Sequence, residues 1–200
     1  MKILGVTGGT GTGKSTVCKI LQEQGAKIID ADRIANALQK RGTVAFDEII
    51  EYFGEGILGT DGELNRRILG ALVFNDINAL KALNAIVHKH VSIEMKKRVE
   101  EYRKEGADLV VLDVPIPIED GFFDTADLVW AVVANDDLRI ERLQERNGLS
   151  ESEAVARIGS QFSNSEYSEL ADVTIDNEGS YEDLKQLVLY ELRRFKEFLT

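Results

Sequence analysis

Short apolar runs alternate with longer amphipathic stretches along this chain. Most of the apolar runs end at a glycine or an aspartate, as buried strands do where they lead into turns. The last amphipathic stretch carries Leu184, Val188 and Leu192 at helical spacing. The alternation predicts an α/β fold, a parallel five-stranded sheet flanked by helices. The expected strands are residues 2–6, 27–29, 109–112, 128–134 and 172–175, and the expected helices include 14–24, about 78–104 and 181–198.

The second and third expected strands are separated by roughly eighty residues that contain no convincing strand. One crossover helix needs far fewer residues, so we interpret about 33–106 as a helical insertion that binds the substrate. The whole chain then forms a single domain. Its core covers about 1–32, 107–138 and 171–200, and a helical lid covers about 139–170.

Composition narrows the possible classes of protein. The chain has 200 residues, with 24 Lys and Arg against 35 Asp and Glu, and its net charge of −11 argues against binding nucleic acid. Cys18 is the single cysteine, which excludes an internal disulfide and a cysteine zinc cluster. The longest apolar run, 128–134, is too short to cross a bilayer, and the N-terminus does not resemble a signal peptide. We therefore expect a cytoplasmic protein without a membrane partner.

A glycine-rich segment after the first expected strand carries the strongest chemical signal. Residues 8–15 match the phosphate-binding pattern G-x-x-x-x-G-K-[ST], between an expected strand and an expected helix. A turn that binds nothing is the alternative, and the strand–loop–helix context favours the phosphate loop. Lys14 is predicted to reach the β- and γ-phosphates, and Ser15 to bind Mg²⁺. The predicted ATP-binding residues are Gly8, Gly9, Thr10, Gly11, Thr12, Gly13, Lys14, Ser15 and Thr16.

Acidic residues follow two of the expected strands. Asp32 can accept the proton of an acceptor hydroxyl and help to bind Mg²⁺, or it can cap a helix through 34–38. Asp113 is placed like the second acidic ligand of Mg²⁺, or its carboxylate is satisfied by the following turn. We favour the functional interpretation for both and leave Asp30 open. The predicted metal ligands are Ser15, Asp32 and Asp113.

Three arginines fall on one face of an expected helix. At about 100° per residue, Arg139, Arg142 and Arg146 lie near 0°, 300° and 340°. They form either a solvated face or a cationic edge that clamps the transferred phosphoryl group. Gly148 is expected to end this helix, and Ser150 starts the next with a capping box. The second helix carries Arg157 and Gln161, so we expect the two helices to form a mobile lid.

A series of segments in a fixed order extends these motifs over nearly the whole chain. The segments are 5–17, Ile29-Asp30-Ala31-Asp32, Leu64-Asn65-Arg66, Val73-Phe74-Asn75-Asp76, Ala85-Ile86-Val87-His88, 111–115, Arg142, Arg146, Arg157-Ile158, Gln161 and 171–179. In this order they resemble the dephospho-coenzyme A kinase family.

The resemblance implies transfer of the γ-phosphate of ATP to the ribose 3′-hydroxyl of dephospho-coenzyme A, the last step of coenzyme A synthesis. It implies a small-molecule partner, and we expect a monomer or a weak homo-oligomer. It matches Asp32 to the catalytic acidic position and Arg142 or Arg146 to lid arginines, and Lys14 completes the catalytic set. The residues expected to bind the acceptor are Thr7, Asp32, Arg66, His88 and Asp113.

Three positions depart from the family pattern. His88-Lys89 replaces His-Pro, Pro115-Ile116-Pro117-Ile118-Glu119 replaces Pro-Leu-Leu-Phe-Glu, and Glu166-Tyr167 replaces Glu-Lys. A diverged kinase for another nucleoside, nucleotide or small alcohol is therefore a second hypothesis. A nucleotide-dependent switch is a third, disfavoured because the sequence has no guanine-specific N-K-x-D segment.

Overall fold

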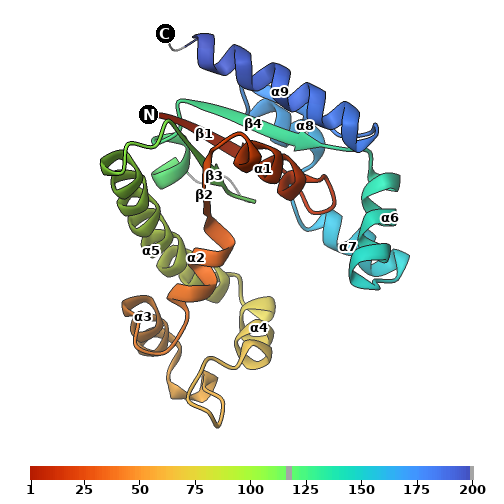
Figure 1. The fold of residues 1–200 in the computed structure, drawn as a ribbon. Helices are drawn as coiled ribbons and strands as arrows, with labels where there is room; N and C mark the ends of the chain where they lie inside the picture. Colours follow the sequence, from red (N-terminus) through yellow and green to blue (C-terminus); the bar gives the residue numbers. More distant parts are fainter. Residues whose placement is uncertain (116–118, 199–200) are drawn as a thin grey trace. The chain divides into compact units, whose positions relative to one another are not determined.

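The computed structural model describes residues 1–115 and 119–198. Within this part of the chain, five parallel strands form one sheet in the order β2-β3-β1-β4-β5 (Figure 1). The predicted α/β class and all five predicted strands are confirmed, with ends that differ by one residue or so. The strands are β1 (Lys2–Thr7), β2 (Lys27–Asp30), β3 (Leu109–Asp113), β4 (Leu128–Val133) and β5 (Val173–Asp176).

Side chains that alternate along the strands cover one face of this sheet. Leu4 and Val6 of β1, Val111 of β3 and Trp130 of β4 lie in one buried cluster. Two helices pack on this face, α1 (Lys14–Glu23) and α9 (Tyr181–Phe198). Burying each large apolar side chain contributes about 1.5–3 kcal/mol, so this core fixes the strand ends from which the site residues project.

The remaining elements are helical. They are α2 (Ala31–Leu38), α3 (Val44–Phe53), η1 (Glu55–Ile57), α4 (Arg66–Asn75), α5 (Ile77–Lys104), η2 (Glu119–Phe123), α6 (Asp136–Asn147), α7 (Glu151–Gly159) and α8 (Asn164–Glu169). The predicted helix boundaries at Gly148 and Ser150 are confirmed. Gly148 ends α6 in the left-handed conformation, and Ser150 and Glu153 form a capping box at α7.

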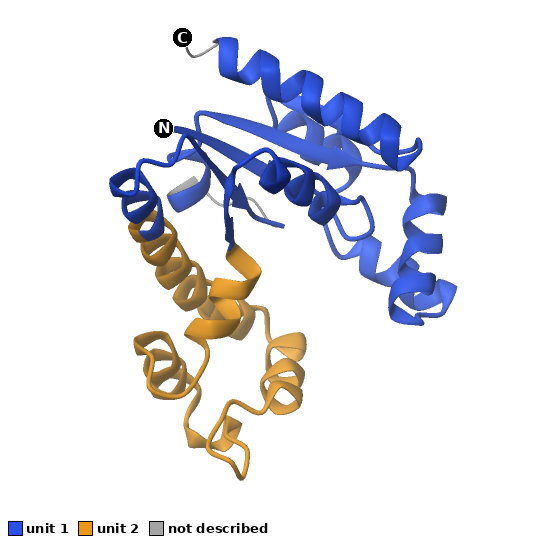
Figure 2. Ribbon diagram, in the orientation of Figure 1, with its two compact units in different colours: residues 1–30, 98–200 blue, residues 31–97 orange. Residues whose placement is uncertain are grey.

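The chain divides into two compact units (Figure 2). Unit 1 contains residues 1–30 and 98–200 and includes the sheet, and unit 2 contains residues 31–97. Unit 2 is helical and has a small core of its own around Ile49, Ile57 and Leu69. Residues 139–170, expected to form a lid, belong to unit 1. Among the described residues, no helix has the length and apolar character needed to cross a membrane.

Candidate active site

The glycine-rich loop runs from the end of β1 to the first turn of α1. Gly13 adopts a φ of 93°, and a Cβ at this position would collide with the side-chain amide of Asn177. A Cβ on Gly8 would meet the carbonyl oxygen of Val132 in β4. Glycine is therefore required where the loop lies directly against β4 and the segment after β5.

The N-terminus of α1 is left open by its own sequence. Gly13 occupies the N-cap position, and no side chain caps the helix there. By contrast, Thr43, Asn65, Asn135, Ser150 and Ser163 cap α3, α4, α6, α7 and α8 through side-chain oxygens. The first N–H groups of α1 are thus available to an anion, and the helix dipole favours one at this end.

Lys14 and Asp113 form an ion pair next to this helix terminus. Their side chains are only 16% and 12% exposed, so water screens the pair weakly. Asp113 ends β3, and Asp30 ends the neighbouring strand β2 in register with it. Cys18 lies on the next turn of α1, where burial and then the negative charge of Asp113 raise the pKa of its thiol well above the usual value. The structure therefore brings Lys14 and Asp113 together and keeps Cys18 as a neutral thiol.

Arg142 and Asn177 hold the second half of the loop. The guanidinium of Arg142 donates to the carbonyl oxygens of Gly11 at 3.2 Å and of Asn177 at 2.9 Å. The amide nitrogen of Asn177 donates to the carbonyl oxygen of Thr12 at 2.7 Å, and Asn177 is only 6% exposed. Sequence reasoning gave Asn177 no role. The segment 171–179 carried a resemblance to a family, but nothing in the spacing indicates that this amide contacts the loop.

Arg139 and Gln161 hold the first half of the loop. Nε of Arg139 donates to the carbonyl oxygen of Thr10 at 2.9 Å, and the N–H of Thr10 donates to Oε1 of Gln161 at 2.7 Å. Arg139 is 1% exposed, so the solvated-face alternative for the arginine stripe is wrong at this residue. Arg146, the third arginine of the stripe, is exposed and its Nε donates to Asn147.

A pocket of about 500 Å³ opens beside the second half of the loop. Gly11 and Gly13 line it from the loop, and Arg142 and Arg146 line it from α6. The other lining residues are Ser15, Thr16, Glu145, Asn177, Gly179, Tyr181 and Leu184. Two arginines beside an open helix terminus make this pocket suited to a phosphorylated ligand.

The donors on the nucleotide side suit Mg²⁺. No group of three or more His, Cys, Asp or Glu side chains within residues 1–115 and 119–198 could hold a metal alone. Mg²⁺ is usually bound by one or two protein oxygens together with substrate phosphates, and the Ser15 hydroxyl and the Asp113 carboxylate are oxygen donors of this kind. The residues present therefore fit a metal that arrives with its nucleotide.

The remaining predicted site residues lie elsewhere in the two units. Thr7 is fully buried at the end of β1, and its hydroxyl oxygen has no partner among the described residues. Asp32 lies in the first turn of α2, one position inside the helix, and therefore does not occupy the N-cap position that its alternative role required. In unit 2, Arg66 starts α4 and donates to the side chain of Asn36 at 2.7 Å. His88 is half-buried on α5, and burial lowers the pKa of its imidazole.

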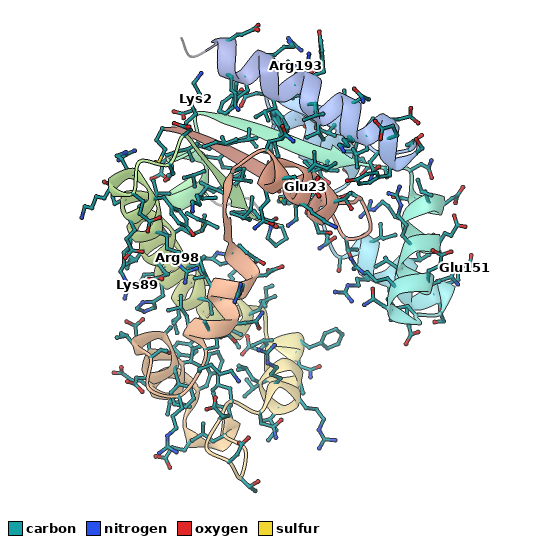
Figure 3. All side chains as sticks on the ribbon, viewed as in Figure 1. Lys2, Glu23, Lys89, Arg98, Glu151 and Arg193 are labelled. Carbon is teal, nitrogen blue, oxygen red and sulfur yellow. The ribbon has the colours of Figure 1, made fainter. Side chains whose placement is uncertain are left out.

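The three positions that depart from the family pattern differ in their surroundings. Lys89 projects from α5 and forms an ion pair with Glu48 of α3 at 3.0 Å (Figure 3). Tyr167 is 1% exposed, and its hydroxyl donates to the carbonyl oxygen of Pro115 at 2.9 Å. Pro117 lies outside the described residues.

A parallel sheet with a phosphate loop after β1, an open α1 terminus and a Lys–Asp pair defines a P-loop nucleotide-binding protein. The family model for dephospho-CoA kinase matches residues 2–183. A dephospho-CoA kinase of Carboxydothermus hydrogenoformans is 42% identical over 98% of this chain and 95% of its own. Another, of Symbiobacterium thermophilum, is 47% identical over 90% of this chain and 75% of its own.

A solved structure of dephospho-CoA kinase from Campylobacter jejuni is similar over the full length of both chains, with 28% identity and a TM-score of 0.71. The chain belongs to the dephospho-CoA kinase family. It is an ATP-dependent kinase.

Proposed function

We propose that this protein transfers the γ-phosphate of ATP to the ribose 3′-hydroxyl of dephospho-coenzyme A and releases coenzyme A and ADP. The observation that carries the nucleotide half is the uncapped N-terminus of α1 beside the Lys14–Asp113 pair. The acceptor half rests on membership of the family. The setting we propose is cytoplasmic, without nucleic acid or membrane, and with the protein as a monomer or weak homo-oligomer.

The nucleoside part of ATP occupies the pocket of about 500 Å³. Its phosphates follow the loop, where they are received by the open end of α1 and by backbone N–H groups of residues 8–16 other than those of Thr10, Thr12 and Thr16, which are bonded within the fold. Lys14 exchanges part of its interaction with Asp113 for the β- and γ-phosphates. Arg142 and Arg146 stand on the same side as the pocket and oppose the negative charge of the phosphates. Residues 139–170 act as the lid over the nucleotide.

Ser15 and Asp113 would hold the Mg²⁺ that accompanies ATP, with Asp32 as a third oxygen donor. When bound, the ion neutralises charge on the β- and γ-phosphates. Asp113 is already anchored by Lys14 at the end of a fully buried strand, so its carboxylate stays in one place. This arrangement gives the metal a fixed protein ligand.

Asp32 acts as the general base. It follows Asp30 by two residues, so its Cα lies at most about 7.6 Å from that of Asp30, whose strand neighbour is Asp113. The Asp32 carboxylate takes the proton of the 3′-hydroxyl as that oxygen forms its bond to the γ-phosphorus. The bond from the γ-phosphorus to the bridging oxygen breaks, and ADP carries away the electron pair. Thr7, Arg66, His88 and Asp113 bind or orient the acceptor.

The test identifies the product. The protein is incubated with Mg²⁺, ATP labelled in its γ-phosphate and dephospho-coenzyme A, and the labelled product is treated with a 3′-nucleotidase. We expect one labelled phosphate per acceptor, released completely by that enzyme. Label in another position, or on a different acceptor from a panel of nucleosides and small alcohols, would contradict the proposal.

A further inference from the structure

A buried arginine of α6 lies against the first half of the phosphate loop. It belongs to none of the family motifs and has no part in the proposed reaction. Arg139 projects from the first turn of α6 and is 1% exposed. Its Nε donates to Thr10 and its Nη1 to Asp136. Its Nη2 is buried and has no hydrogen-bond partner in the described structure. An unpartnered buried donor destabilises a native fold and is rare in native structures.

The free Nη2 faces the loop backbone. A Cβ placed on Gly9 would lie 2.6 Å from Nη2 and 3.4 Å from Oε1 of Gln161. Gln161 in turn accepts the N–H of Thr10. Both polar groups of the Thr10 backbone are therefore held by side chains from residues 139–170, and the spare donor lies beside Gly9.

The positive charge of Arg139 is only partly neutralised. Its ion-pair partner Asp136 is 63% exposed, so water screens that carboxylate far more than it screens the buried guanidinium. Tyr167 approaches from α8, since Asn164, one helical turn earlier, faces Nη1 of Arg139 at 3.5 Å. Tyr167 is neutral and buried, and it donates to Pro115. The formal charges of Arg139 and Asp136 cancel, but the positive member is buried beside the loop and the negative member is exposed, so the local potential at this end of the loop is positive.

The charge lies at the end of the loop away from the nucleoside. Gly11 and Gly13 line the pocket from the loop. The backbone of Arg139 lies against Gly11, whereas its guanidinium reaches past it to Gly9 and Thr10. A nucleotide whose base occupies the pocket extends its phosphates along the loop towards Gly9 and Thr10. With the nucleotide in that pose, the last phosphate of ATP, which ADP lacks, would be the group nearest to the guanidinium of Arg139.

We propose that Arg139 is a positioning residue that holds the carbonyl group of Thr10 in the loop and makes the site prefer ATP to ADP. It does so through the loop backbone and through its charge. The neighbouring phenol of Tyr167 carries no charge, so the positive charge at this end of the loop comes from Arg139. The inference rests on the nucleotide half of the proposed function and needs no particular acceptor.

The test compares the affinities of MgATP and MgADP by calorimetry in the absence of acceptor. Arg139→Gln removes the charge, Arg139→Lys keeps it, and Arg139→Gln combined with Tyr167→Lys moves it to α8. Arg193→Gln, which removes an exposed arginine on α9, is the matched control. Melting temperatures of all variants separate loss of fold from loss of nucleotide preference.

We expect Arg139→Gln to reduce the preference for ATP over ADP about tenfold. Arg139→Lys or the double variant should recover most of that preference, and the control should keep it. An unchanged ratio in Arg139→Gln, or a loss that neither charged variant recovers, overturns the proposal. Because dephospho-coenzyme A is absent from this experiment, a wrong acceptor assignment would leave its result untouched.

Discussion

The two units of the chain differ in how completely their apolar side chains are buried. In unit 1, all five residues of β3 are buried, and Leu4, Val6 and Trp130 are at most 1% exposed. In unit 2, a small set of buried residues is surrounded by helices whose apolar side chains are mostly only partly buried. Rigid strand ends can hold a Lys–Asp pair in place, whereas a loosely packed helical unit can adapt its side chains to a larger ligand. We propose that unit 1 binds the nucleotide and unit 2 the acceptor, and variants in each unit should separate the two tasks.

The largest effect on activity is expected for Asp32→Asn, in the first turn of α2 at the start of unit 2. Loss of a general base lowers kcat about 10²–10⁴-fold, while the amide keeps the size of the side chain and the fold. Binding of ATP in the absence of Mg²⁺ should stay close to wild type. Steady-state kinetics and calorimetry measure both, and Asp30→Asn is the matched comparison because it changes the same side chain two residues earlier. Equal losses in both variants would contradict a special role for Asp32.

Asn177→Asp tests the nucleotide side in unit 1. The substitution removes the donor to the carbonyl of Thr12 and places a carboxylate oxygen near it, so the second half of the loop loosens. We expect KM for ATP to rise about tenfold, with KM for dephospho-coenzyme A within twofold of wild type. A change confined to the acceptor KM would break the assignment of the nucleotide to unit 1.

Arg66→Ala is the counterpart in unit 2. A charged hydrogen bond to an anionic ligand is worth about 1.5–3 kcal/mol, so KM for dephospho-coenzyme A should rise about tenfold or more while KM for ATP holds. Arg67→Ala is the control, since it removes the neighbouring guanidinium on the same helix. If both substitutions have the same effect, Arg66 contributes only to the general charge of α4.

The smallest effect is expected on the pH dependence of the free energy of unfolding, through His88. Burial lowers the pKa of His88 in the folded protein, so the unfolded chain binds its proton more readily. The stability that depends on neutral His88 is present above about pH 6.5 and is lost as the pH falls below that value. Denaturant unfolding of His88→Asn between pH 7.5 and 5 should therefore show a shallower loss of stability than wild type. Parallel curves for the two proteins would contradict the prediction.

Patterns within the sequence predicted the parts of this molecule that local chemistry determines. Strand ends, the phosphate loop, Gly148 and the capping box at Ser150 each follow from residue types a few positions apart. The contacts of Asn177 with Thr12, and of Arg139 with Thr10, join residues more than a hundred positions apart. The helical spacing of the arginines indicated a common face but not that Arg139 would be buried. That outcome depends on how α6 packs against the loop, which no local pattern contains.

The most direct test of the proposed reaction is acceptor-dependent release of ADP from MgATP, with and without dephospho-coenzyme A and with Lys14→Ala as the blank. We expect strong stimulation by the acceptor and its loss in the blank. ATP binding without any stimulation would contradict the acceptor assignment and leave only the nucleotide site.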